Sequence, residues 1–422
     1  MRNNHTGTGR QRVIDALSHR ESAIPVDLGA TSVTGAHATV VEGLRSHCGL
    51  EKRPVKIHEP YQMLGMIEDD LRETLSVDTT GVFARNTMFG FPVEGWKEWR
   101  TPWGQEVLVP EGFRTTVAEN GDLLIYPEGD LSVPPSAKMP VGGFFFDAII
   151  RQEPVDDERL NPADNLEDFV PVSASDLDYF ETSVKEASQR CSAVATFGGT
   201  AVGDIAMVPA PFMKNPHGIR DVAEWYMSTV TRQDYLHEVF DKQTRLAVEN
   251  LARIHERVGD AVDVVYICGT DFGAQSTQFC SPQTFNSLYA PYYKRMNSWI
   301  HEHTSWKTFK HSCGAIAPLI PAMIEAGFDV INPVQLSAVG MDASELKKLY
   351  GDRLVFWGGG VDTQKTLPFG TPSQVREEVL SRCKVLGKGG GFVFNAVHNI
   401  QARTPIANVV AMFDAVREYN GE

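Results

Sequence analysis

The stretch Lys307-Thr-Phe-Lys-His-Ser-Cys-Gly314 leads into a segment from Ala315 to Ala326 and then into Val330-Ile-Asn-Pro333. The first and last pieces are short and largely apolar, as buried strands are. The middle segment has the length and spacing of a helix. A strand, a turn, a helix and a second strand in this order are typical of a parallel sheet that helices cover.

The same rhythm runs through the chain after Glu181. Four more apolar runs predict buried strands, namely Ala193 to Phe197, Val262 to Ile267, Leu354 to Gly358 and Gly391 to Asn395. The other predicted helices are 220–230, 235–257, 282–303, 343–349 and 372–386. With an early strand at Ala23 to Gly29, we predict an α/β fold that closes into a TIM-like (β/α)8 barrel. An open doubly wound sheet is the alternative that this pattern leaves open.

Between about residues 80 and 150 the pattern changes. Trp96, Trp99 and Trp103 lie close together, and short apolar runs alternate with Gly, Pro and Asn turns. We interpret this region as an N-terminal β-rich insertion or cap on a single domain that spans 1–422. No separate second domain is predicted.

The charge of the chain limits its partners. Its formal net charge is −15, which argues against nucleic-acid binding because phosphates require clustered positive charge. We expect no membrane partner, since there is no signal-peptide pattern and no apolar run long enough to cross a bilayer. The six cysteines are scattered, as in a reduced protein, and we therefore expect a cytoplasmic location.

Polar residues follow the predicted strands, at the end of a barrel where functional groups gather. His311 and Cys313 are two positions apart, so both side chains point the same way from the end of an extended strand. His398 follows another predicted strand, and closure of a barrel would bring it near. An imidazole, a thiolate and a second imidazole suit Zn²⁺, and three protein ligands with one open position are typical of a catalytic zinc. Taken alone, the pair of His311 and Cys313 is more typical of inert core than of a metal site, and the third candidate ligand His398 changes this balance.

Motifs spread along the chain resemble those of the uroporphyrinogen decarboxylase superfamily. They are Arg12-Val-Ile-Asp-Ala-Leu with Ile24-Pro-Val-Asp, Gly269-Thr-Asp-Phe-Gly-Ala-Gln, His311-Ser-Cys-Gly, Ile331-Asn-Pro-Val-Gln, Trp357-Gly-Gly-Gly-Val-Asp and Asn395-Ala-Val-His-Asn with Arg403-Thr-Pro. The resemblance is clear from about Glu181 to the end and implies a TIM-like barrel. It also implies a homodimer, by analogy with relatives.

Two subgroups of this superfamily differ in their motifs. The decarboxylases bind substrate propionates through an arginine-rich N-terminal motif. The matching region here, Pro25 to His37, contains no arginine. The corrinoid-dependent methyltransferases resemble the chain better, because they bind zinc through a His-x-Cys pair and a later Cys before Thr-Pro. His311 and Cys313 match the pair, whereas His398 stands where the later Cys is expected. No Asp-x-His-x-x-Gly motif for cobalamin is present, so the corrinoid is expected on a separate partner protein.

The replacement of a thiolate by His398 has a chemical consequence. Zinc with one thiolate and two neutral imidazoles keeps a net positive charge, which favours polarisation of a leaving atom. The resemblance therefore implies a zinc-dependent methyltransferase that moves a methyl group from a small O-, N- or S-methyl donor, such as a methoxyaromatic, to the cobalt of a corrinoid protein. Methyl transfer from the corrinoid to a thiol or a folate is the second hypothesis.

The remaining candidates come from the other strand ends. Asp271 and Gln275 match a family Asp-x-x-x-Gln stretch and are predicted to be catalytic, whereas a loop cap is the simpler interpretation. The predicted substrate-binding residues are Asp27, Asn332, Gln335 and Asp362. Turn formation explains several of them equally well. A metal-free decarboxylase and a non-catalytic, corrinoid-binding accessory protein remain the competing functions.

Overall fold

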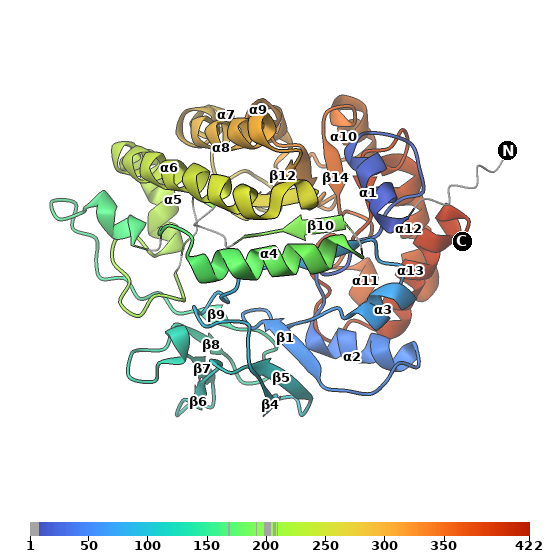
Figure 1. Cartoon of the computed structure of the whole chain (residues 1–422), viewed down its shortest axis with the longest axis horizontal. Helices are drawn as coiled ribbons and strands as arrows, with labels where there is room; N and C mark the ends of the chain where they lie inside the picture. Colours follow the sequence, from blue (N-terminus) through green and yellow to red (C-terminus); the bar gives the residue numbers. More distant parts are fainter. Residues whose placement is uncertain (1–7, 168, 191, 198–203, 206–207, 209) are drawn as a thin grey trace.

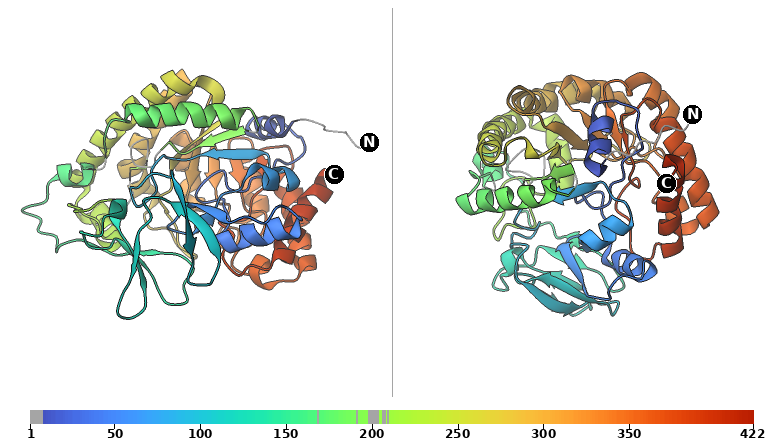
Figure 2. Two further views of the ribbon diagram at one scale, coloured as in Figure 1. Left: turned by 60° about the horizontal axis from the view of Figure 1, so that its bottom comes forward. Right: turned by 45° about the vertical axis from the view of Figure 1, so that its right-hand side comes forward.

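The computed structural model describes residues 8–167, 169–190, 192–197, 204–205, 208 and 210–422. Its largest sheet has seven parallel strands in the order β15-β14-β13-β12-β11-β10-β3. The strands are β3 (Thr79–Val82), β10 (Ser192–Ala195), β11 (Val264–Cys268), β12 (Lys307–His311), β13 (Val330–Asn332), β14 (Val355–Trp357) and β15 (Phe392–Val393). The sheet curls and gives a TIM-like α/β fold, as the sequence predicts (Figure 2).

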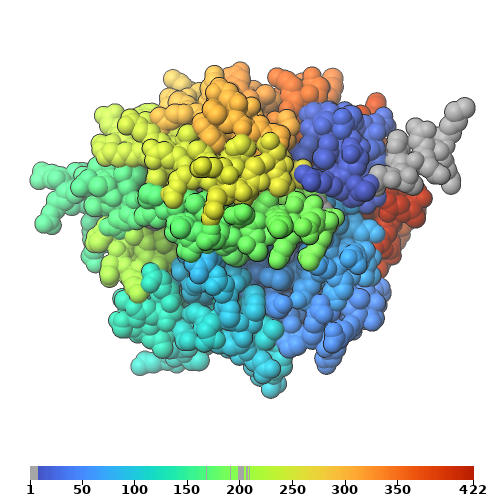
Figure 3. Space-filling view, viewed as in Figure 1, coloured from blue at the N-terminus to red at the C-terminus, as the bar shows by residue number. Residues whose placement is uncertain are grey.

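Both faces of these strands are buried, which explains their nearly continuous apolar sequences. Tyr266, Phe309 and Trp357 share one apolar cluster, which α1 joins through Val13 and Leu17. The alternate strand residues pack against the surrounding helices instead. The helices are α1 (Gly9–Leu17), α2 (Ala38–His47), α3 (Asp69–Thr74), α4 (Ala174–Ser188), α5 (Val222–Thr231), α6 (Gln233–Val258), α7 (Pro282–Thr284), α8 (Ala290–His303), α9 (Ile320–Glu325), α10 (Ala343–Tyr350), α11 (Thr366–Phe369), α12 (Pro372–Leu386) and α13 (Ile406–Asn420). Helices α4 and α6 lie side by side over one face (Figures 1 and 3).

The predicted early strand bonds to both edges of the seven-stranded sheet. Val26 forms a parallel bridge with Phe394, and Phe394 N donates to Pro25 O at 2.8 Å. On the other side, Asp78 N, just before β3, donates to Val26 O at 2.7 Å. The segment is thus a single bridge rather than a full strand, yet its hydrogen bonds join the two edges of the sheet.

Two small sheets lie together beside the parallel sheet (Figures 1 and 2). One has the order β2-β1-β5-β4 and the other β6-β7-β8-β9. Their strands are β1 (Val55–Glu59), β2 (Leu64–Gly65), β4 (Trp96–Arg100), β5 (Glu106–Pro110), β6 (Thr115–Val117), β7 (Leu123–Ile125), β8 (Ala137–Met139) and β9 (Asp147–Ala148). Residues 96–148 are therefore β-rich. That they form a cap on a single domain of 1–422 stays a prediction.

The structure differs from the expected element bounds in other places as well. Residues 79–82, at the start of the predicted insertion, pair with β10 in the main sheet as β3. Segment 55–65 joins the small sheet because β1 pairs with β5 in parallel, a contact that sequence periodicity does not reveal. The helix expected over 282–303 is divided by a π-helical turn, Phe285–Tyr289, between α7 and α8.

No helix in the described part of the chain combines the length and the apolar character that crossing a bilayer requires.

Asp27, predicted to bind substrate, is buried where the joining segment meets the sheet. Its carboxylate accepts hydrogen bonds from Ala30 N (3.1 Å), Thr79 Oγ1 (2.6 Å) and Trp357 Nε1 (2.8 Å). These contacts give the buried Asp27 carboxylate a structural role. Its role in substrate binding stays a prediction.

We predict that Asp27→Ala lowers the free energy of unfolding by about 3–5 kcal/mol, because it leaves three buried hydrogen-bond donors without an acceptor. Urea denaturation measures this change. Asp352→Ala is the matched control, since the Asp352 side chain is 81% exposed, and it should change stability by no more than about 0.5 kcal/mol. Equal effects of the two substitutions would contradict a structural role for Asp27.

Candidate metal centre

Three potential ligands converge at the carboxyl ends of the parallel strands. His311 ends β12, Cys313 follows it by two residues, and His398 lies beyond β15. Their ligand atoms all lie within 4.8 Å of one another. The His311 and His398 rings are 5.5 Å apart, and His311 Nε2 lies 3.4 Å from Cys313 Sγ. Curling of the sheet brings together residues that are 85 or more positions apart in the sequence.

Asn332 fixes the orientation of His311. The Asn332 side chain, at the end of β13, donates from Nδ2 to Trp357 O at 2.9 Å, which leaves its Oδ1 as an acceptor. This Oδ1 lies 2.6 Å from His311 Nδ1, so the Nδ1–H donates to it. Nε2 is then unprotonated and points toward Cys313, as metal coordination requires. Asn332 is fully buried and contacts the candidate ligand, and the substrate-binding role predicted for it stays a prediction.

The loop that carries Cys313 is held on two sides. Cys313 N donates to Asp271 Oδ1 at 2.7 Å, and Gly314 N donates to Gln335 Oε1 at 2.8 Å. Gly314 has φ +90°, and a Cβ there would overlap the backbone of Gly273. Only glycine fits this turn without strain. Asp271 and Gln335 thus position the Cys313 loop, while the roles predicted for them in catalysis and substrate binding stay predictions.

Side-chain hydrogen bonds continue from His311 around the barrel. They run from His311 to Asn332, from Asn332 to the Trp357 carbonyl, and from the Trp357 indole to Asp27. Asp27 in turn accepts from Thr79 on β3. These contacts tie the candidate ligand on β12 to the segment that joins the sheet edges.

Burial shifts the titration of all three candidate ligands. It lowers the pKa of His311, and it lowers the pKa of His398 to about 4, helped by the neighbouring His311. Both imidazoles are therefore neutral near pH 7, the form that binds a metal. Burial also raises the pKa of the Cys313 thiol well above its usual range, and the nearby Asp271 carboxylate raises it further. A bound cation would favour the thiolate.

The three residues fit a zinc ion. Tetrahedral zinc with bonds of about 2.0–2.3 Å places neighbouring ligand atoms about 3.3–3.8 Å apart. The 3.4 Å between His311 Nε2 and Cys313 Sγ lies in this range, and the 4.8 Å limit for the whole set requires only a small inward movement. Among the residues that the structure describes, no fourth ligand joins this set, which leaves one tetrahedral position for water or substrate. The Asp271 carboxylate lies beside the centre, with Oδ1 3.7 Å from His311 Nε2.

Two predicted site residues lie away from this centre. Gln275 Nε2 donates to Gln364 Oε1 at 2.9 Å on the exposed rim, and Asp362 Oδ1 accepts from Gln364 N and Lys365 N within a turn. The described contacts link neither side chain to His311, Cys313 or His398. A catalytic role for Gln275 and substrate binding by Asp362 stay predictions.

Lys310 and Asp204 contact the strand ends beside the centre, yet sequence reasoning missed both. Lys310 could have been noticed, because a lysine inside a buried strand is unusual and indicates a specific partner. Asp204 gives none, because nothing in the sequence around it indicates that it lies beside Cys268. Gly198 and Gly199, which follow the predicted strand Ala193 to Phe197 directly, lie outside the described residues.

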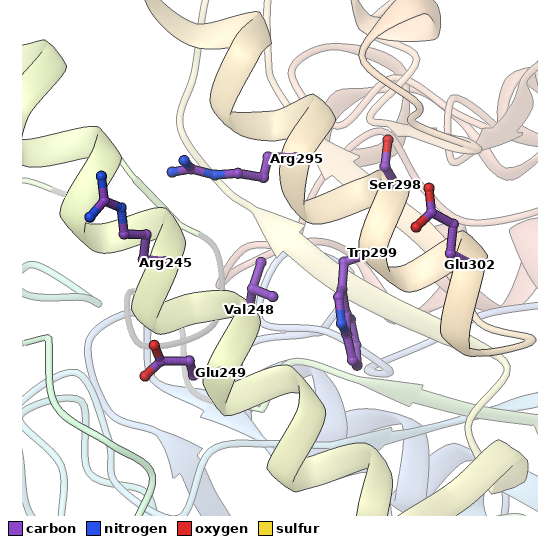
Figure 4. Close-up of a pocket in the computed structure, with 7 residues that line it drawn as sticks. All are labelled: Arg245, Val248, Glu249, Arg295, Ser298, Trp299 and Glu302. Atoms are coloured by element: carbon purple, nitrogen blue, oxygen red, sulfur yellow. The ribbon is translucent and has the colours of Figure 1, made fainter.

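A hollow of about 470 Å³ lies elsewhere, between the outer faces of α6 and α8 (Figure 4). Arg245, Glu249, Arg295, Trp299 and Glu302 line it. It contains none of the candidate ligands.

Comparison with known proteins supports the fold and the family. The model of the family "Uroporphyrinogen decarboxylase (URO-D)" matches residues 145–419, more than half of the chain. Uroporphyrinogen decarboxylase of Psychromonas ingrahamii is 35% identical over 94 residues, 21% of this chain and 26% of that protein. The enzyme of Pseudoalteromonas translucida is 23% identical over 215 residues, 47% of this chain and 57% of that protein. The aligned parts thus span between a quarter and a little over half of these relatives.

A methyltransferase from Methanosarcina mazei has a similar structure. Its TM-score is 0.54 over 98% of this chain and 99% of that chain, at 15% sequence identity. At this identity the similarity establishes a shared fold.

We predict that the metal-free protein loses stability as the pH falls from about 6.5 to about 4. In this window the unfolded chain protonates His398, whose usual pKa is 6.5, while the folded chain, with a pKa of about 4, does not. His398→Gln should therefore flatten the dependence of the unfolding free energy on pH. Urea denaturation at several pH values measures it, with the exposed His303→Gln as control. An unchanged slope in His398→Gln would contradict the lowered pKa of this imidazole.

Proposed function

The chain belongs to the uroporphyrinogen decarboxylase family, and on this premise we propose that it is a zinc-dependent methyltransferase of the corrinoid-dependent type. In this proposal His311, Cys313 and His398 hold the metal. The methyl group moves between a small methyl donor and the cobalt of a corrinoid that a separate protein carries.

One observation carries the proposal: His311, Cys313 and His398 converge at the catalytic end of the barrel. Their ligand atoms lie within 4.8 Å, and the Nε2 of His311 is oriented toward Cys313 by the Asn332 hydrogen bond. Cys313 and His398 are only half-buried, so the centre is open on one side. A structural zinc site would instead be closed by a fourth protein ligand.

Zinc bound there would supply a Lewis acid that polarises the heteroatom bearing the methyl group. The chain supplies the orientation. Asn332 keeps the imidazole of His311 in the correct tautomer, and Asp271 and Gln335 hold the Cys313 loop through its backbone N–H groups. Asp271, whose side chain is 44% exposed, also offers a carboxylate at the open side to accept or release a proton.

The ligand set favours demethylation of a donor over methylation of a thiol. One thiolate and two imidazoles would leave a net positive charge on a bound zinc ion, and this charge would stabilise negative charge on a departing oxygen, nitrogen or sulfur. A site with two thiolates would be neutral and would better activate a bound thiolate. We therefore propose a small O-, N- or S-methyl compound as the donor and the corrinoid protein as the acceptor.

A tetrapyrrole decarboxylase is the alternative function within the family. A substrate with several carboxylates needs cationic partners, and Pro25 to His37 supplies no arginine. This favours the methyltransferase.

We predict about one zinc per chain in the wild type and loss of most of it in His311→Ala, Cys313→Ala and His398→Ala. Metal analysis of the purified proteins measures this. Cys48→Ala, which removes a thiol from the end of α2, is the control and should retain the metal.

The same wild-type preparation should methylate a reduced corrinoid protein in the presence of a suitable methyl donor, read as the spectral change from Co(I) to methyl-Co(III). Retention of zinc in all three variants would disprove the ligand assignment. A wild type without metal that decarboxylates a polycarboxylate substrate would replace this function with that of a metal-free lyase.

A further inference from the structure

Lys310 is fully buried in β12, directly before the candidate ligand His311. A buried ammonium is costly unless polar partners replace water. Its three N–H donors can satisfy three acceptors. Nζ lies 2.6 Å from Thr270 O, 2.5 Å from His311 O and 3.5 Å from Cys268 Sγ. Nζ also lies 4.9 Å from the centre of the Phe272 ring.

These contacts join the ends of two adjacent strands. Thr270 and Cys268 belong to the end of β11 and the loop after it, and His311 ends β12. The next residue along the chain from Thr270 is Asp271, which holds Cys313 N. The Lys310 ammonium therefore contacts the carbonyl of Thr270, the residue before Asp271, and the backbone carbonyl of His311 itself.

Asp204 holds the same segment from the other side. Its Oδ2 accepts from Gly269 N at 2.9 Å, and its Oδ1 accepts from Thr270 Oγ1 and Cys268 Sγ, each at 2.9 Å. Asp204 is 4% exposed. The Cys268 thiol lies between the two charges, so the buried carboxylate and the buried ammonium balance each other across residues 268–270.

We propose that Lys310, with Asp204 as its counter-charge, is a positioning residue that sets the affinity of the centre for its metal. It contacts no predicted ligand atom. It acts by fixing the carbonyls of Thr270 and His311, and thereby the spacing between Asp271, Cys313 and His311. This inference rests on the proposed metal site and adds to it a residue outside the ligand set.

The arrangement argues against a purely structural reason for the lysine. Replacement of both members of a buried charged pair by apolar residues of similar volume is often neutral or stabilising, so packing against Phe272 does not by itself require a charged pair here. Lys307, on the same strand, shows the ordinary alternative: its side chain is 39% exposed and pairs with Asp329 at 3.2 Å.

The test compares Lys310→Met with Lys307→Met. Zn²⁺ affinity is measured by competition with a chromophoric chelator, and the Co²⁺-substituted proteins are examined by absorption spectroscopy. Lys310→Met should weaken Zn²⁺ binding by about 10–100-fold, the range typical of residues that support metal ligands. The thiolate-to-Co²⁺ and d–d bands should also shift. Lys307→Met should match the wild type in both.

The outcomes separate this inference from the proposed function. A wild type that binds neither metal overturns the metal site and this proposal with it. A wild type that binds, together with Lys310→Met of unchanged affinity and unchanged Co²⁺ spectrum, overturns the role of Lys310 alone.

Asp204→Asn covers the case in which Lys310→Met fails to fold. It keeps the shape of the side chain and removes the counter-charge, so it should weaken Zn²⁺ binding in the same direction and shift the same Co²⁺ bands. Thermal unfolding confirms that the variant is folded. Wild-type affinity in a folded Asp204→Asn would overturn the proposal.

Discussion

The hydrogen bond between His311 Nδ1 and Asn332 Oδ1 determines what the rest of the site can do. It selects the tautomer of the imidazole, and it is itself fixed because Asn332 Nδ2 donates to the Trp357 carbonyl. Through the Trp357 indole, the same network reaches Asp27, where the first and last parts of the sheet meet. Orientation of the ligand and connection of the sheet edges therefore depend on one set of buried contacts, which explains why polar side chains are tolerated there.

The electrostatics of the centre follow from its burial. Neutral imidazoles and a thiol that resists ionisation are the states favoured when no cation is nearby. A divalent cation would stabilise the thiolate and would be repelled little by its neighbours, because Asp271 adds a negative charge at the open side. The positive Lys310 lies behind the strand, where its ammonium is occupied by carbonyl oxygens. The open side of the centre thus faces solvent, and the side that Lys310 supports faces the helices.

The sequence predicted the parallel strands and the His311–Cys313 pair because both depend on local patterns: apolar runs and the two-residue period of a strand. His398 required the further idea of closure, which the structure supports by bringing its ligand atom to the other two. Three features were not predictable: the pairing of β1 with β5, the hydrogen bonds of Asn332 and Gln335, and the contacts of Lys310 and Asp204 with residues 268–270. Each depends on residues that are distant in sequence, and an amide or a lysine after a strand has the same appearance whether it faces substrate or supports a loop.

X-ray absorption at the zinc edge of the zinc-loaded protein tests the central claim most directly. We expect a first shell of one sulfur at about 2.3 Å and two imidazole nitrogens at about 2.0–2.1 Å, completed by a light atom from water or substrate. A shell without sulfur, or with two or more sulfurs, would contradict the assignment of His311, Cys313 and His398 as the ligands.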